Sequence, residues 1–299
     1  MIRIGTAGWS YPSGEGRWTG VFYPMGREKP DPLEFYARYF DTVEVNSTFY
    51  RPLAPNVAQS WAEKTPPDFR FGIKLYQKFT HPKMFEEATG YEAALGSRDF
   101  ERFLEGIAPL KEAGKLGPVL AQFPASFKRS DENLAHLEGL ARKLADIQLV
   151  IELRHQSWTE DEATRNVLSA NRVSWAHIDE PKFASSIGQV PNVGPLGYFR
   201  FHGRNAKEWW KGDAEQRYNY LYSPHEQADL AQQITAVAGT AGDTHVVYNN
   251  HYRAKAVANG LQMKLLLGQD VPDDVPAPLL EEYPDLAKLL EREAVERTT

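Results

Sequence analysis

The sequence has no cysteine in its 299 residues, which excludes disulfides, zinc sites built on thiolates and cysteine nucleophiles. It also lacks a surplus of positive charge, because 34 Lys and Arg stand against 40 Asp and Glu and give a formal net charge of -6. Proteins that bind nucleic acid non-specifically usually carry a basic surplus. Nucleic acid is therefore a less favoured partner, although a local basic pocket is compatible with this balance.

Long hydrophobic runs and several common catalytic motifs are absent too. No segment approaches the roughly 18 apolar residues of a membrane helix, and MIRIGTAGW has no apolar run behind a basic start. We therefore expect no membrane partner, no signal peptide and a cytoplasmic location. No G-x-G-x-x-G follows the first predicted strand, and P-loop, G-x-S-x-G and H-E-x-x-H motifs are missing. These absences argue against dinucleotide, P-loop, serine-hydrolase and zincin chemistry.

What is present is an alternation of two patterns. Eight segments rich in Val, Ile and Phe, bounded by Gly, Pro or polar residues, predict buried strands. They are Ile2–Ala7, Thr42–Asn46, Phe69–Leu75, Pro118–Phe123, Gln148–Arg154, Ser174–Asp179, Gly197–His202 and His245–Asn250. Helices are predicted at Leu33–Phe40, Asn56–Lys64, Ser97–Ala113, Asp131–Leu144, Glu160–Ala170, Pro224–Ala238, Ala254–Leu267 and Asp285–Glu296, with Asp131 and Ser223 at N-cap positions.

Strands that alternate with helices indicate a parallel sheet, and eight such units in this length favour closure into a (β/α)8 TIM barrel. An open doubly wound sheet is the alternative. We expect one domain over residues 1–299, with a helical C-terminal extension from about residue 270. The sixth unit is expected to be irregular, because Pro181–Pro195 is rich in Ser, Gly and Pro and shows no helical pattern. Leu75–Gly96 is interpreted as a loop at the rim.

Side chains alternate across a strand, so the apolar set of each strand indicates which residues face the helices. In the fifth strand, the apolar Leu149, Ile151 and Leu153 face outward, which leaves Glu152 and Arg154 inside the barrel. The third strand is less clear for Lys74, and alternation does not decide between Asn249 and Asn250. The same reasoning places further side chains inside: Glu44, Asn46, Gln122, Trp175, His177, Asp179, Tyr198, Arg200 and His202.

Polar residues near the C-terminal ends of strands point to a functional site, because active sites of TIM barrels lie at that face. An isolated buried charge costs several kcal/mol, so these groups must be paired or used. The alternative is a set of paired charges that fills the barrel and has no other role.

Several motifs carry a family resemblance. They are GTAGWSY at 5–11, FYP at 22–24, VEVNSTFYR at 43–51, the run from Trp61 to Phe69, FGIKL with Thr80 and His81, LGPVLAQFPASF at 116–127, ELRHQSW at 152–158, FRFHGR at 199–204 and VYNN at 247–250. With these motifs the chain resembles the YecE-like family, domain of unknown function 72, over about residues 1–267. The resemblance implies a TIM barrel and a site at the strand ends, but no established reaction.

The candidate site combines cations, carboxylates and aromatic rings. Arginine forks suit phosphate or carboxylate, and carboxylates supply general acid–base groups. The catalytic candidates are Glu152 as the preferred base, Glu44, His202 and Asp179. For each histidine, the non-catalytic alternative is a neutral ring that is hydrogen-bonded in the rim. The aromatic rings are expected either to stack on sugars or bases or to pack the rim of the barrel. The expected ligand contacts are Arg154, Arg200, Arg204, Lys74, Asn46, Gln122, Trp9, Tyr11, His155, Trp158, Asn249 and Asn250.

No cofactor is expected. A divalent metal is the less favoured alternative, held by Glu152, Asp179 and His202 as in sugar-isomerase and apurinic-endonuclease barrels. The nearby arginines would repel a cation, and Asn249 is a poor ligand.

The preferred function is an enzyme that acts on an anionic, phosphate- or carboxylate-bearing, sugar-containing small molecule at the barrel mouth. A nucleic-acid-processing barrel similar to an endonuclease and a non-catalytic ligand-binding protein are the alternatives. The sequence does not distinguish a hydrolase from an isomerase or lyase, nor does it give the oligomeric state.

Overall fold

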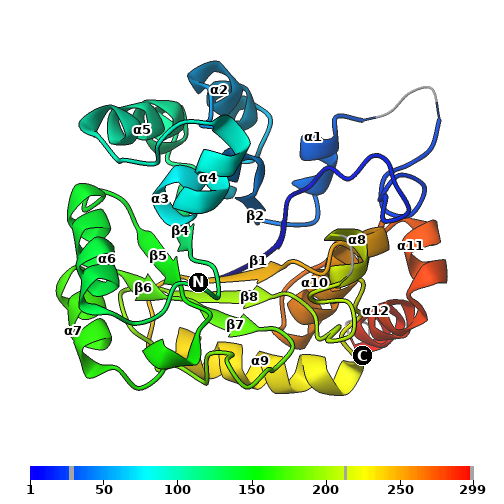
Figure 1. The fold of residues 1–299 in the computed structure, drawn as a ribbon. Helices are drawn as coiled ribbons and strands as arrows, with labels where there is room; N and C mark the ends of the chain where they lie inside the picture. Colours follow the sequence, from blue (N-terminus) through cyan, green and yellow to red (C-terminus); the bar gives the residue numbers. More distant parts are fainter. Residues whose placement is uncertain (27–29, 212–213, 297–299) are drawn as a thin grey trace.

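A central sheet of nine parallel strands organises the computed structural model, which describes residues 1–26, 30–211 and 214–296 (Figure 1). The strand order is β6-β5-β4-β3-β2-β1-β9-β8-β7, a nearly closed barrel. The strands are β1 (Ile2–Ala7), β2 (Thr42–Val45), β3 (Arg70–Lys74), β4 (Leu116–Gln122), β5 (Leu149–Glu152), β6 (Ser174–Trp175), β7 (His177–Asp179), β8 (Gly197–Phe201) and β9 (Thr244–Tyr248). The predicted barrel of alternating strands and helices is confirmed.

The sixth unit is irregular, as predicted. Its strand is divided at Ala176, and the two halves β6 and β7 pair with different neighbours, β5 and β8. The backbone N–H of Ala176 still donates to Ile151 O at 2.9 Å, whereas that of Trp175 donates to Val193 O at 3.1 Å. No helix forms between β7 and β8. This divided strand is where the two edges of the sheet approach each other.

Helices surround the strands, with α9 and α10 beside β8, β9 and β1 and with α2 beside α5 (Figure 1). The longer ones are α2 (Pro55–Glu63), α5 (Ser97–Glu112), α6 (Asp131–Lys143), α7 (Glu162–Ala170), α9 (Pro224–Ala238) and α10 (Lys255–Leu266). The shorter ones are α1 (Pro32–Tyr36), α3 (Gln77–Thr80), α4 (Pro82–Thr89) and α8 (Ala214–Arg217). At the C-terminal side, α11 (Ala277–Glu282) leads into α12 (Pro284–Glu296), which packs on α10.

Two local predictions need correction. The segment after β3 is not a plain loop, because it holds α3 and α4; His81 separates them and Pro82 starts the second. The N-cap of α6 is Ser130 rather than Asp131, since the Ser130 hydroxyl accepts the Asn133 N–H at 3.1 Å. Ser223 caps α9 as predicted, in a capping box with Glu226.

The side chains of the sixth strand face the opposite way from the prediction. Ala176 and Ile178 pack inside the barrel with Val150 and Tyr198. Trp175 lies in the outer core, and the His177 ring stacks on Phe199 with centroids 4.8 Å apart. Both sets contain apolar side chains, so hydrophobicity did not identify the inner face. Because Trp175 and His177 point outward, Asp179 also lies outside the barrel.

Candidate functional site

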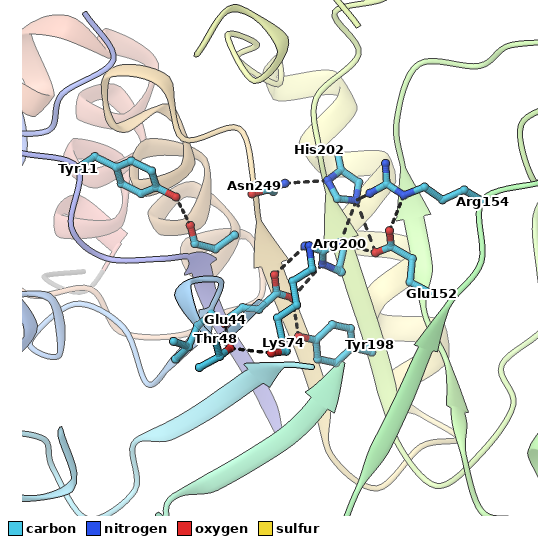
Figure 2. Close-up of polar contacts among 12 residues, drawn as sticks. Tyr11, Glu44, Thr48, Lys74, Glu152, Arg154, Tyr198, Arg200, His202 and Asn249 are labelled. Carbon is cyan, nitrogen blue, oxygen red and sulfur yellow. Dashed lines mark hydrogen bonds and ion pairs between the residues drawn. The ribbon is translucent and has the colours of Figure 1, made fainter. Parts of the chain in front are cut away.

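A buried ion-pair network lies at the C-terminal ends of the strands (Figure 2). Arg200, from β8, donates through Nε and Nη2 to the Glu44 carboxylate of β2, at 2.9 and 2.7 Å. Its Nη1 donates to Glu152 Oε2, at the end of β5. Glu44 and Glu152 are 0% exposed and Arg200 is 1% exposed. One guanidinium therefore pairs with two carboxylates, and leaving either carboxylate unpaired would carry a large desolvation cost.

Arg154 and Tyr198 extend this network. Tyr198 Oη donates to Glu44 Oε2 at 2.8 Å, and Arg154 Nε donates to Glu152 Oε1 at 2.7 Å. Burial alone would raise the pKa of Glu152, but Arg154 and Arg200 outweigh it and hold that pKa well below its usual range. Glu152 is thus a fixed carboxylate whose two oxygens are already engaged, which makes it a weak general base.

Glu180 is a member of the site that the sequence analysis missed. Its Oε2 lies 3.1 Å from Arg154 Nη1 but makes no hydrogen bond within the described residues. Burial raises the pKa of Glu180 against the opposing charge of Arg154. With Ala176 and Ile178 facing inward, Glu180 is the next inward position of the same stretch. A correct orientation of the sixth strand would have identified it.

His202 is fully buried and neutral. Burial, followed by Arg154 and Arg200, lowers its pKa to about 3. Its Nε2 lies 3.1 Å from Arg154 Nη2, and the side-chain amide of Asn249 lies 2.9 Å from Nδ1. Since guanidinium groups only donate, Nε2 accepts from Arg154. His202 therefore positions Arg154 and is not a proton donor near neutral pH.

Lys74 ends β3 on the inward face, in register with the interior residue Leu120. Its Nζ lies 4.3 Å from the centre of the Phe49 ring and has no hydrogen bond or ion pair in the part of the chain that the structure describes. Burial and then Arg200 lower the pKa of Lys74 to about 7, while Glu44 and Glu152 oppose this shift. Figure 2 shows Lys74 beside the network. The Thr48 hydroxyl Oγ1 donates a hydrogen bond to the backbone carbonyl of Lys74 at 2.6 Å.

Aromatic rings form the outer rim. The half-buried Tyr11 donates its hydroxyl to Ala7 O and stacks on His251 with centroids 4.4 Å apart. Tyr218, which the sequence analysis did not single out, lies 5.1 Å from the same imidazole ring. Trp9 meets Trp61 edge to face at 5.1 Å and is also half-buried. These rings surround the mouth with apolar faces and polar edges.

Several predicted site residues lie elsewhere. Asp179, outside the barrel, accepts from Arg204 Nη2 at 2.7 Å and from the Tyr222 hydroxyl at 2.8 Å, so neither Asp179 nor Arg204 joins the network. Asn250 faces outward and donates to Asn259 Oδ1 at 2.9 Å. Trp158 is fully buried and has no face free for a ligand, because it stacks on Phe127 and donates to that residue's carbonyl.

Three other candidates have local roles. His155 caps the turn Gln156–Trp158 by accepting the Ser157 N–H at 3.1 Å. Gln122 Nε2 donates to Phe123 O at 3.0 Å. Asn46 follows β2 at the mouth, and its buried Oδ1 has no partner within the described ranges.

The alternative metal set is not assembled, because Asp179 lies outside the barrel whereas Glu152 and His202 lie inside. No group of three or more His, Asp or Glu in the described part of the chain is arranged to hold a metal ion. Likewise, none of the helices in that part is long and apolar enough to cross a membrane.

Five surface cavities lined by described residues lie away from the network. One of about 450 Å³ is lined largely by apolar side chains, including Phe22 and Phe35, beside the Arg38–Asp274 ion pair. At the mouth, Lys74 and Arg154 keep partial exposure while Arg200 and His202 have almost none. The surface accessible at the mouth therefore belongs to Lys74 and Arg154 rather than to the buried Arg200 and His202.

Known proteins share this arrangement of strands. Residues 3–281 match the family described as "Protein of unknown function DUF72". The chain belongs to the DUF72 family. Among DUF72 relatives, UPF0759 protein YunF of Bacillus subtilis (strain 168) is 30% identical over 280 residues, covering 89% of this chain and 95% of that protein. UPF0759 protein YecE of Escherichia coli (strain K12) is 33% identical over 173 residues, 56% of this chain and 54% of that protein.

Solved DUF72 structures are similar over nearly the whole chain. A DUF72 family protein from Thermotoga maritima MSB8 has a TM-score of 0.77 and 34% identity, covering 90% of this chain and 100% of that chain. A second, from Enterococcus faecalis V583, has a TM-score of 0.77 and 31% identity, covering 91% and 97%. The family description names no reaction, so the chemistry of this DUF72 protein has to be inferred from the site.

Proposed function

We propose that this DUF72 protein is an enzyme that acts on a small anionic, sugar-containing molecule at the barrel mouth. The observation that carries the proposal is the unpaired Lys74 amine beside carboxylates that arginines have already neutralised. A lysine ammonium offers three donors, and none of those of Lys74 is engaged by a described residue. Lys74 is therefore the cation best placed to contact a phosphate or carboxylate.

This proposal changes the roles expected for the arginines. Arg200 is buried between Glu44 and Glu152, and Arg204 is held by Asp179 outside the barrel. Arg200 is therefore not available for a ligand, and Arg204, although 39% of its side chain is accessible, lies away from the network. Arg154 keeps partial exposure, with 15% of its side chain accessible, and remains a second ligand contact. The buried arginines then serve to fix the site rather than to bind the substrate.

The rim supports the sugar part of the proposal. Trp9 is half-buried and lies at the mouth, where its ring face suits the apolar face of a sugar, whereas the half-buried Tyr11 ring is already stacked on His251. Glu180 is the better candidate for proton transfer than Glu152, because its pKa is raised and one of its oxygens makes no hydrogen bond within the described residues. In the network, the positive charges of two arginines cancel the negative charges of two glutamates. Because no positive excess is left for a phosphate backbone, this balance favours a small ligand over nucleic acid.

Calorimetric titration with D-ribose 5-phosphate tests the anion contact. Replacing Lys74 by Met removes a charged hydrogen bond of about 1.5–3 kcal/mol, which corresponds to roughly 10- to 100-fold weaker binding. Lys143→Met, at an exposed position at the end of α6, is the matched control and should bind as the wild type does. Equal binding by Lys74→Met and wild type would refute the proposed role.

The pH dependence of sulfate binding provides an independent check, because sulfate keeps one charge state between pH 6 and 8. Lys74 is protonated below its pKa of about 7, so affinity should fall as the pH rises through that value. Phosphorus NMR of the bound sugar phosphates then tests for conversion. Tight binding without conversion of any sugar phosphate would contradict the enzymatic part of the proposal.

A further inference from the structure

We propose that the Lys74 amine is a nucleophile that forms an imine with the aldehyde or ketone carbon of an open-chain sugar phosphate. This inference rests on the proposed function and specifies its substrate class: Arg154, the second ligand contact, holds the phosphate while the neutral Lys74 amine meets the carbonyl carbon. The geometry is that of an amine at the end of β3, lying over the Phe49 ring and bonded to no described side chain. A lysine in such a desolvated place beside other cations is a known way to activate an amine.

Burial is the main influence that favours a neutral Lys74 amine, and the charges around it act in both directions. The groups that act on it are Arg200 and Arg154, which favour loss of its proton, and Glu44 and Glu152, which oppose it. His81, on the neighbouring segment, is itself kept neutral, because burial and Lys74 lower its pKa to about 4. The carboxylates of Glu44 and Glu152 are turned toward arginines, which limits their effect on Lys74.

The consequence for reactivity is large. An unperturbed lysine, with a pKa of 10.5, is neutral in roughly one molecule in 3,000 at pH 7, whereas Lys74, with a pKa of about 7, is neutral in about half. The concentration of nucleophile is therefore on the order of 10³-fold higher than for a surface lysine.

The step balances without an oxidant or a reductant. The lone pair of Nζ attacks the carbonyl carbon, the C–N bond forms and the carbonyl π bond breaks. The oxygen takes one of the amine protons, which gives a carbinolamine. With one further proton from solvent, the hydroxyl leaves as water and a protonated imine remains. The overall change is amine plus carbonyl plus one proton, giving iminium plus water.

Borohydride trapping tests the inference directly. The wild-type protein is incubated with D-glyceraldehyde 3-phosphate, reduced with sodium borohydride and analysed by mass spectrometry and peptide mapping. We expect one adduct, located on Lys74, with a trapping rate that rises through pH 7. Lys74→Arg keeps a cation but cannot form the imine, so it should lose the adduct. Lys143→Arg should keep it.

The outcomes separate this inference from the proposed function. Sugar phosphate that binds through Lys74 without a trapped adduct would overturn the imine and leave the anion site standing. Trapping on Lys74 that is equally fast with unphosphorylated D-glyceraldehyde would support the imine and overturn the anion site. Adducts spread over surface lysines at equal rates would also overturn the imine.

Discussion

Replacing Arg200 by Met should destabilise the protein more than any exposed ion-pair deletion. Arg200 is buried and bridges Glu44 and Glu152, which are both inaccessible to water. Methionine fills part of the same volume but supplies no donor. Glu44 then keeps only the Tyr198 hydroxyl, and Glu152 keeps Arg154.

The magnitude follows from the desolvation of the carboxylate left behind. Removing one partner of a buried ion pair costs about 3–5 kcal/mol. An unfolding entropy of about 2.1 cal/mol/K per residue over 299 residues gives near 0.6 kcal/mol/K, so the melting temperature should fall by roughly 5–8 °C. The exposed pair of Arg142 and Glu138 is the control, and Arg142→Met should cost at most about 1 kcal/mol.

Urea unfolding at several pH values measures the effect and its cause. In the wild type, the pKa of Glu152 is depressed, so its stabilising contribution is present above the unfolded value near 4.5 and is lost as the pH falls through the folded value. Without Arg200 this pKa rises. The stability difference between wild type and variant should therefore be full above about pH 5 and shrink below it.

A double-mutant cycle tests whether the unpaired Glu44 carboxylate causes the loss of stability in Arg200→Met. Glu44→Gln removes the stranded charge, so combining it with Arg200→Met should cost about 1–3 kcal/mol less than the sum of the two single changes. Arg200→Met with wild-type stability at pH 7.5, or strictly additive effects in the cycle, would refute the buried network.

Two other features of the fold yield predictions. Burial, followed by Arg3, lowers the pKa of His245 to about 3, so the wild type loses stability as the pH falls below 6.5. In urea titrations, His245→Phe should reduce the slope of stability against pH between pH 6 and 4 by about 1.4 kcal/mol per pH unit. An unchanged slope would count against a neutral buried ring. A Cβ on Gly5 would lie 2.0 Å from Thr42 O, so Gly5→Ala should lose about 1–3 kcal/mol, whereas Gly139→Ala in α6 meets nothing within 4 Å and should gain about 0.5–1 kcal/mol. Thermal melts that reverse this order would contradict the close approach of β1 and β2.

Side-chain alternation predicted the network where the two faces of a strand differ clearly. In β8, Phe199 and Phe201 face the helices, and Tyr198 and Arg200 accordingly face the interior. In the sixth strand, small and large apolar residues alternate, so the rule selected the wrong face. The structure places Ala176 in the inner cluster with Val150 and Trp175 in the outer core.

The sequence could not predict which charged residues pair with one another. Arg200 bonds residues 156 and 48 positions away, and only the closure of the barrel brings those positions together. The sequence therefore predicted a convergent set of cations, whereas the fold neutralises Arg200 inside and moves Arg204 outside with Asp179. The ligand contact that we propose is therefore Lys74, whose orientation the third strand left undecided.

Burial lowers the pKa of Lys74 first, and the same guanidinium that fixes the carboxylates adds to this shift. Glu44 and Glu152 by themselves would favour the protonated amine, and Arg200 is the strongest charge acting against them. Glu180 shows the complementary effect, since burial raises its pKa while that of Lys74 is lowered. Two groups at one site whose pKa values are displaced in opposite directions can divide the roles of nucleophile and acid. If the charged residues only filled the barrel, each would need a partner of opposite charge. Lys74 has no such partner among the described residues, which argues for a role beyond filling the barrel.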